Sequence, residues 1–279
     1  MNIAECINDL ERRAADTIKA ERGDYIMDGL LHCGKCKTPK QVRVELFGRV
    51  RTPMCLCKCA AEQRDREEQE RQRQAFEEKI KRMRKAGFPD EDMQKWTFAR
   101  DDHANERIST IARNYVENFA EMRKNGKGLV FFGNVGTGKT FTAACIANAL
   151  IDKGRPCMVT NFSRLINTIS GMYEGKQEYI DNLNNFHLLV IDDFAVERST
   201  EYVNEIVYNI IDSRYRAGLP LIVTTNLTAA ELKNPADMSK KRIYSRLYDM
   251  CLMVEVSGED RRRAHLKQDF EKFHELLGI

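Results

Sequence analysis

Three glycines, a lysine and the threonine that follows it stand together in one segment, Gly133-Asn134-Val135-Gly136-Thr137-Gly138-Lys139-Thr140. Because glycine has no Cβ, the backbone can turn tightly and bring its N–H groups close to phosphate oxygens. The lysine can supply a full positive charge to the β- and γ-phosphates, and the threonine hydroxyl can ligate Mg²⁺. The spacing therefore predicts a loop, Gly133 to Phe141, that binds the phosphates of a nucleotide such as ATP or ADP.

The segments on either side of this loop have the composition that phosphate binding requires. Residues 128–132 form a short apolar run ending at the loop, which is typical of a buried strand. Residues 141–151 have the pattern of a helix, whose N-terminus offers free N–H groups and partial positive charge. A glycine turn that matches by chance is the alternative, and the flanking strand and helix disfavour it.

A second apolar run, Leu188 to Ile191, leads directly into Asp192 and Asp193. Such a run is typical of a buried parallel strand, whose carboxyl end lies at the edge where ligands bind in these sheets. We expect Asp192 to hold Mg²⁺ together with Thr140, and Asp193 to polarise the attacking water. A further predicted strand ends at Asn226, whose amide could orient that water. Capping of a turn is the alternative role for an asparagine at this position.

Two arginines, Arg242 and Arg246, are spaced four residues apart and are predicted to share one face of a helix. Nothing within one subunit obviously needs them. An arginine that reaches a neighbouring copy could neutralise charge on a transferring phosphoryl group. Three further arginines at 261–263 begin the predicted closing helix, where they contact nucleotide or DNA or simply face solvent.

Nine cysteines are present, and five of them fall between residues 33 and 59. A tetrahedral Zn²⁺ site needs four ligands, and we expect these to be Cys33, Cys36, Cys57 and Cys59, with Cys55 or His32 as alternative ligands. About 30 residues cannot build a sufficient apolar core, so the metal would supply most of their stability. A redox role is the alternative, but no thioredoxin-like pattern surrounds the first pair.

The length and the composition of the chain fit one large domain with a small additional module. The chain has 279 residues, is 42% hydrophobic and 31% charged, and carries a net charge of only +3, so any nucleic-acid surface must be local. No apolar run is long enough for a membrane span, and no signal peptide is evident, which predicts a cytoplasmic protein. We expect a helix and zinc module over 1–59, a charged linker helix over 60–87 and a nucleotide-binding domain over 88–279. The first helix, residues 1 to about 22, either binds a partner or packs on its own domain.

In order along the chain, these motifs resemble the AAA+ ATPases of the DnaC/DnaI helicase-loader group, which includes the IstB transposition helpers. The resemblance covers about residues 88–279, and the cysteine-rich segment looks like the zinc domain that precedes it in many members. It implies an α/β P-loop fold with a parallel sheet of about five strands. By this resemblance Lys139 and Thr140 match Walker A, Asp192 and Asp193 match Walker B, and Asn226 matches sensor 1. Arg246 matches the arginine finger with Arg242 beside it, and Arg262 is the candidate for sensor 2.

The resemblance also implies a function. A member of this group binds ATP, assembles on a replicative hexameric DNA helicase, helps to place it on single-stranded DNA, and associates with its own copies. Many AAA+ proteins carry Asp-Glu in Walker B, whereas this chain has Asp192-Asp193, so we expect slow hydrolysis that DNA or a partner stimulates. The alternatives are an IstB-like transposition helper and a nucleotide-gated adaptor without significant hydrolysis.

Overall fold

The computed structural model describes residues 20–46, 48–194, 200–235, 237–261, 273–274 and 276–278. The chain divides into two compact units, Met1–Glu77 and Glu78–Ile279. The helix predicted from residue 1 to about 22 lies, up to residue 19, outside the described residues. Within the described part of the chain, none of the helices is both long enough and apolar enough to cross a membrane.

The first unit contains two short antiparallel hairpins. Strands β1 (Tyr25–Met27) and β2 (Leu30–His32) form one, and β3 (Val44–Leu46) and β4 (Arg49–Arg51) form the other. Asp28 and Gly29 join β1 to β2 with φ angles of 52° and 70°, the backbone of a type I′ turn that suits the Asp-Gly sequence. The unit is therefore built from turns rather than from an extended sheet.

A long helix, α2 (Lys58–Gly87), runs through the boundary between the two units. Its charges pair along the helix surface, as between Arg73 and both Glu70 and Glu77. In the second unit, Ile80 and Met83 of this helix pack against an apolar core. The helix ends at Gly87, a position where no side chain would fit, because a Cβ there would lie 2.1 Å from the Cys157 carbonyl oxygen.

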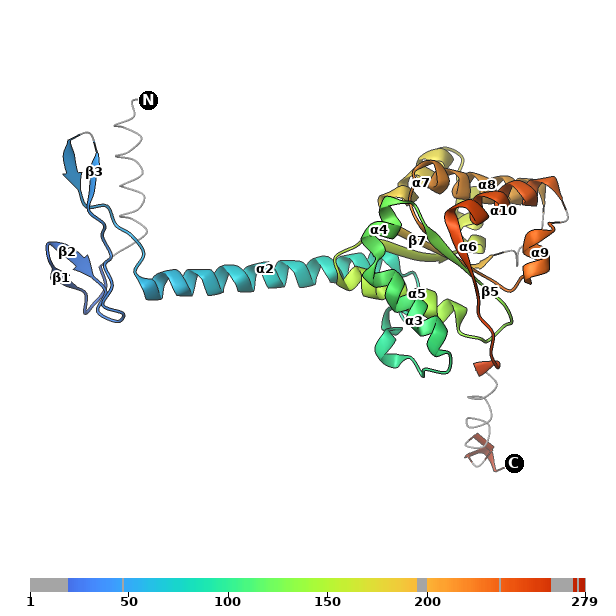
Figure 1. Ribbon diagram of the computed structural model, residues 1–279, viewed down its shortest axis with the longest axis horizontal. Coiled ribbons are helices and arrows are strands. Elements are labelled where there is room, and N and C mark those ends of the chain that lie inside the picture. The colour runs from blue at the N-terminus through green and yellow to red at the C-terminus, as the bar shows by residue number, and fades with distance from the viewer. Residues whose placement is uncertain are drawn as a thin grey trace. The chain divides into compact units, whose positions relative to one another are not determined.

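The second unit is built on a parallel sheet, drawn in Figure 1. Its strands are β5 (Gly128–Phe132), β6 (Cys157–Asn161), β7 (Leu188–Phe194), β8 (Leu221–Thr225) and β9 (Cys251–Glu255). Among the described residues these five strands pair in the order β6-β7-β8-β5-β9, with every neighbouring pair parallel. The predicted α/β fold with a parallel central sheet is therefore confirmed.

Helices cover both faces of this sheet. Successive strand residues alternate between two apolar cores: Val130 and Ile191 lie in one core, and Phe131 and Val190 in the other. The second core also holds residues of α3 (Glu106–Glu117) and α5 (Lys139–Asp152). The first holds residues of α6 (Phe162–Ser170), α7 (Lys176–Asn182), α8 (Glu201–Arg216), α9 (Ala229–Lys233) and α10 (Met238–Met250).

Shorter elements lead into the domain and connect its parts. They are η1 (Met93–Lys95), η2 (Phe98–Arg100), α4 (Phe119–Lys124) and η3 (Leu183–Asn185). Asn148 of α5 donates hydrogen bonds of 2.9 and 2.8 Å to the carbonyl oxygens of Met93 and Trp96. Because Asn148 is fully buried, these two bonds fix the lead-in segment against the helix that follows the glycine loop.

Candidate nucleotide-binding site

The glycine loop joins β5 to α5, as its sequence predicts. Gly138 stands immediately before the helix with a φ of 93°, a left-handed conformation that favours glycine. A Cβ on Gly133 would lie 2.5 Å from the backbone oxygen of Val256, so the close approach of β9's extension also requires glycine there. The loop thus has the shape of a phosphate cradle, and its residues fit the triphosphate that the motif implies.

Lys139 lies under this loop and is only 6% exposed. Its ammonium donates hydrogen bonds of 2.9 Å to the Gly133 carbonyl and 2.7 Å to the Asn134 carbonyl. These bonds hold the charge at the loop that would surround the phosphates. A bound phosphate would offer the ammonium a full negative charge, which makes a stronger hydrogen bond than a neutral carbonyl does.

Asp192 lies at the end of β7 and is 8% exposed. Burial raises the pKa of its carboxyl above the ordinary range, and the nearby charge of Asp193 raises it further. Hydrogen bonds from Thr224 and Thr140 act in the opposite direction. A buried carboxylate beside the Thr140 hydroxyl is a fitting pair of oxygen ligands for Mg²⁺, whose charge would keep the carboxylate ionised.

Asp193 sits in a β-bulge, which the sequence does not reveal. The register between β7 and β8 shifts from Ile191–Val223 to Phe194–Thr225, so Asp192 and Asp193 together face the single residue Thr224. Asp193 has a φ of 53°, in the left-handed region that residues other than glycine seldom adopt. As a result, Asp192 is buried while Asp193 is exposed at the cavity described next.

A cavity of about 640 Å³ opens above the loop. Residues from five segments of the chain line it, including Trp96, Lys139, Thr140, Phe141, Asp193 and Asn226. The structure thus brings the predicted lysine, threonine, acid and amide to one place, with room for a nucleotide between them. The rings of Trp96 and Phe141 lie 5.9 Å apart with their planes tilted by 43°, forming an aromatic wall beside the phosphate loop.

Arg261 also lines this cavity, together with Arg100 and Asp102. Its guanidinium lies 3.0 Å from a carboxylate oxygen of Asp102, and its backbone N–H donates a 3.0 Å hydrogen bond to Gly136. Arg262, the predicted sensor 2, lies outside the described residues. Sequence reasoning missed Arg100 and Asp102, which belong to none of the motifs. It named Arg261 only within a run of three arginines, and such a run does not show which one turns inward.

The expectation that nothing within one subunit needs the α10 arginines is wrong for Arg246. Its Nε lies 2.5 Å from Asp212 Oδ1, and its Nη2 donates a 2.6 Å hydrogen bond to the Tyr208 hydroxyl. The guanidinium carbon also lies 4.5 Å from the centre of the Tyr208 ring. Arg242 is exposed, and no ion pair involving it occurs in the described part of the chain. Arg242 is therefore the better placed of the two to reach another molecule.

The first unit brings together the four cysteines that the sequence favours as zinc ligands: Cys33, Cys36, Cys57 and Cys59, whose sulfur atoms all lie within 4.8 Å of one another. The Sγ of Cys59 lies 3.6 Å from that of Cys33 and 3.5 Å from that of Cys57. Sulfurs bound tetrahedrally at about 2.3 Å from Zn²⁺ would be about 3.8 Å apart, so the cluster fits this metal.

Neither alternative ligand joins the cluster. The thiol of Cys55 contacts the Pro39 carbonyl at 3.8 Å, and the Nδ1 of His32 lies 3.0 Å from the Leu30 carbonyl. Thr38 and backbone N–H groups lower the pKa of the Cys36 thiol to about 5. Hydrogen bonds with the other three sulfurs, that with Cys57 foremost, raise the pKa of Cys59 to about 12. Four thiolates therefore need a cation between them, which Zn²⁺ would provide.

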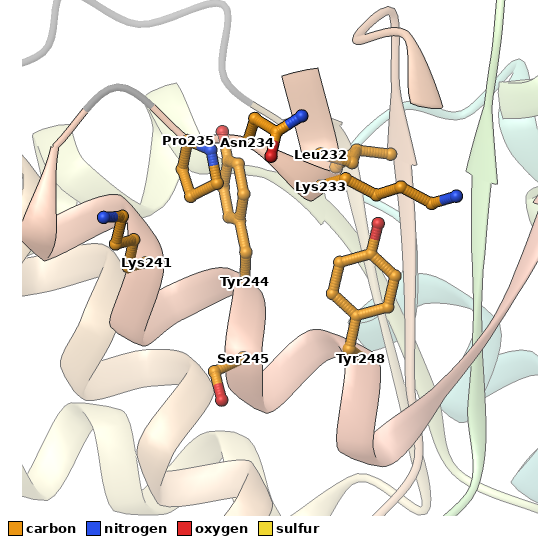
Figure 2. A pocket seen from close by; sticks show the side chains of 8 residues that line it. All are labelled: Leu232, Lys233, Asn234, Pro235, Lys241, Tyr244, Ser245 and Tyr248. Carbon is orange, nitrogen blue, oxygen red and sulfur yellow. The ribbon is translucent and has the colours of Figure 1, made fainter. Parts of the chain in front are cut away.

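A second hollow, of about 380 Å³, lies between α9 and α10 (Figure 2). Tyr244 forms a buried wall at 5% exposure, and the ring of Tyr248 stands half open at 40%. The side chains of Lys233 and Lys241 extend to opposite sides of the hollow and point away from each other (Figure 2). Because their charges do not converge, the hollow lacks the geometry of an anion site.

The fold and the site together define a P-loop nucleotide-binding protein. Its features are a parallel sheet, a glycine loop between β5 and a helix, and two acids on β7, which β8 separates from β5 in the sheet. Residues 60–269 match the family model described as IstB-like ATP binding protein, and the chain belongs to this family. Its membership accounts for the order of the motifs along the second unit.

Relatives of this chain are named helicase loaders. The replicative helicase loader DnaI of Bacillus subtilis is 24% identical over 201 residues, which is 67% of this chain and 64% of DnaI. The replicative helicase loader DnaC of Escherichia coli is 29% identical over 125 residues, which is 43% of this chain and 50% of DnaC. The chain thus matches between half and two thirds of the length of these relatives.

Solved structures support the fold. A crystal structure of DnaI superposes with a TM-score of 0.52 at 20% identity, covering 61% of this chain and 96% of DnaI. A crystal structure of the DnaC helicase loader gives a TM-score of 0.50 at 24% identity, covering 60% of this chain and all of that one (100%). At these identities the likeness establishes the shared fold of the nucleotide-binding unit.

Proposed function

We propose that this protein is an ATP-dependent loader that delivers a replicative hexameric helicase to single-stranded DNA. The observation that carries the proposal is a complete nucleotide pocket in a family member whose named relatives are helicase loaders. Lys139 and the glycine loop would bind the phosphates, and Thr140 and Asp192 would hold Mg²⁺. Asp193 and Asn226, both at the cavity, would orient the attacking water.

The zinc unit would dock the helicase. Its hairpins leave several large apolar side chains exposed: Ile26, Met27, Val42, Leu46 and Val50. Exposed apolar side chains of this density on a small metal-bound module are typical of a surface that meets a partner. The Zn²⁺ ion at Cys33, Cys36, Cys57 and Cys59 would hold both hairpins in place, since neither is long enough to be stable alone.

Hydrolysis would be slow, and binding of ATP would act mainly as a switch. Asp193 is one methylene shorter than the glutamate at this position in many AAA+ proteins, so it would hold the attacking water less closely. Full activity would need a neighbouring copy. Arg242, exposed on α10, would supply positive charge to the neighbour's γ-phosphate, while Arg246 keeps α10 attached to α8.

The family description favours one alternative, an IstB-like helper that acts with a transposase on DNA. The zinc unit favours the helicase instead, because a docking module of this kind suits a defined protein partner. A nucleotide-gated adaptor without hydrolysis would need an incomplete site, whereas the lysine, both acids and the amide lie together here.

Copurification distinguishes these functions. Tagged protein is mixed with candidate replicative helicases and with a transposase, with and without ATP, and retained partners are identified. We expect one hexameric helicase to be retained and a Val50→Glu variant, changed at an exposed hairpin position, to lose it. Tyr173→Glu, a fully exposed site in the other unit, is the matched control and should retain the helicase. Selective retention of the transposase would contradict the proposal.

A further inference from the structure

Thr224 is fully buried on β8, beside the two acids of β7. Its hydroxyl donates a short hydrogen bond to Asp192 Oδ1 and accepts a 3.0 Å hydrogen bond from the backbone N–H of Asp193. One side chain thus contacts both acidic residues, one through its carboxylate and the other through its backbone. A hydroxyl can do this because it is both a donor and an acceptor.

The position of Thr224 matters because it faces the bulge. Two residues of β7 oppose this single residue of β8, so the regular ladder cannot satisfy both backbone N–H groups there. The Thr224 hydroxyl accepts from the N–H that the bulge displaces. Asp193 meanwhile keeps a φ of 53°, which an L-residue holds only when its surroundings enforce it. The hydrogen bond to Thr224 is one such constraint.

Thr225, the residue after Thr224, connects the bulge to the segment that carries Asn226. The Thr225 hydroxyl donates a 2.8 Å hydrogen bond to the Phe194 carbonyl, at the far end of the bulge. It also accepts a 3.2 Å hydrogen bond from the backbone N–H of Leu227. The peptide that carries Asn226 is therefore tied to the strand that carries Asp193, so the acid and the amide share one support.

We infer that Thr224 is a positioning residue for ATP hydrolysis: its hydroxyl fixes the bulge that aims Asp193 at the attacking water while Asp192 faces Mg²⁺. The inference rests on the proposed ATPase function. Removal of the hydroxyl releases the Asp193 backbone and the Asp192 carboxylate at once. Nucleotide binding depends mainly on the glycine loop and Lys139, so the loss falls on kcat rather than on the KM for ATP.

The test compares steady-state ATP turnover of the full chain with Thr224→Val, which keeps the shape and lacks the hydroxyl. A misplacement of about 1 Å can cost about a hundredfold in rate, so we expect kcat to fall by about ten- to a hundredfold. The KM for ATP should change by less than about threefold, because phosphate binding is left in place. Thr224→Ser, which keeps the hydroxyl, should recover kcat to within about threefold of the parent.

Thr160 provides a matched control on the other neighbour of β7. It pairs with Ile191, is 5% exposed, and its hydroxyl has no hydrogen-bond partner within the described residues. Thr160→Val makes the same chemical change in the same sheet and should leave kcat unchanged. Should Thr224→Val fold poorly, Thr224→Ala against Thr224→Ser repeats the comparison, since both lack the methyl group and only serine keeps the hydroxyl.

Two results overturn the inference. If Thr224→Val, or Thr224→Ala where valine is not tolerated, turns over ATP at the parental rate, Thr224 has no positioning role and the ATPase proposal stands. If Thr224→Ser is as impaired as Thr224→Ala, the hydroxyl that serine keeps gives no benefit, and packing of the methyl group that both variants lack is responsible instead. A parent whose turnover equals that of Lys139→Ala would refute the ATPase proposal as well, which separates the two failures.

Discussion

Asp192 and Arg246 both belong to motifs, but their neighbours decide what each side chain can do. The carboxyl group of Asp192 is buried and accepts hydrogen bonds from the hydroxyls of Thr224 and Thr140. A buried carboxylate of this kind is stabilised by a nearby cation, and Mg²⁺ would supply that charge. The guanidinium of Arg246 is bound to Asp212 and Tyr208, so few of its N–H groups are available to contact another subunit. At the scale of single residues, the site is therefore defined by partners that lie outside the motifs.

The α10 arginines give a prediction at this scale. Arg246→Ala removes an ion pair and a hydrogen bond from a mostly buried group, so it should lower the free energy of unfolding by about 1–3 kcal/mol. Arg242→Ala, at an exposed position, should change it by less than about 0.5 kcal/mol. Urea unfolding of both variants measures this. Arg242→Ala should instead lower ATP turnover at protein concentrations where copies associate.

The two variants exchange roles if Arg246 is the residue that reaches a neighbour. In that case Arg246→Ala would unfold at the parental urea concentration and lose the concentration-dependent part of ATP turnover. Arg242→Ala would keep that turnover in full. This pair of results would return the arginine-finger role to Arg246.

At the scale of elements, the strands and the glycine loop could be predicted because their sequence patterns are local. Leu188 to Ile191 is apolar without interruption, and it forms the buried strand β7. The bulge at Asp193 could not be predicted, because it depends on a threonine of another strand. Similarly, the inward turn of Arg261 depends on Asp102, which is far away in the sequence.

The cysteine cluster gives a prediction at the scale of the two hairpins. Cys36→Ser removes one of four clustered sulfurs, whereas Cys55→Ser removes a sulfur outside the cluster. A structural zinc site contributes about 10–16 kcal/mol of binding free energy at neutral pH, so loss of one ligand should abolish stable binding. Metal analysis should find about one Zn²⁺ per chain in the parent and in Cys55→Ser, and almost none in Cys36→Ser.

The same samples report on the fold of the first unit. Removal of Zn²⁺ with a chelator should unfold the hairpins of the parent and leave ATP turnover by the second unit intact. Equal zinc content in Cys36→Ser and Cys55→Ser would show that these four sulfurs do not form the metal site.

At the scale of the whole molecule, the chain joins a small unit that contains the four-cysteine cluster to a nucleotide-binding unit of the IstB-like family. The sequence predicts a cysteine-rich module over 1–59, a charged helix over 60–87 and a nucleotide-binding domain from 88, since composition changes sharply between these segments. The proposed loader uses both units: one recognises the helicase and the other changes state with ATP. Neither task requires fast hydrolysis.

The central claim is that the cavity at Lys139, Asp192 and Asp193 binds and slowly hydrolyses Mg²⁺-bound ATP. The most direct test is steady-state ATP turnover of the parent and of Lys139→Ala, with and without Mg²⁺, single-stranded DNA and the copurified helicase. We predict a slow, Mg²⁺-dependent parental rate that rises with DNA or helicase, and no turnover by Lys139→Ala. Equal rates for the two proteins under all these conditions would contradict the account.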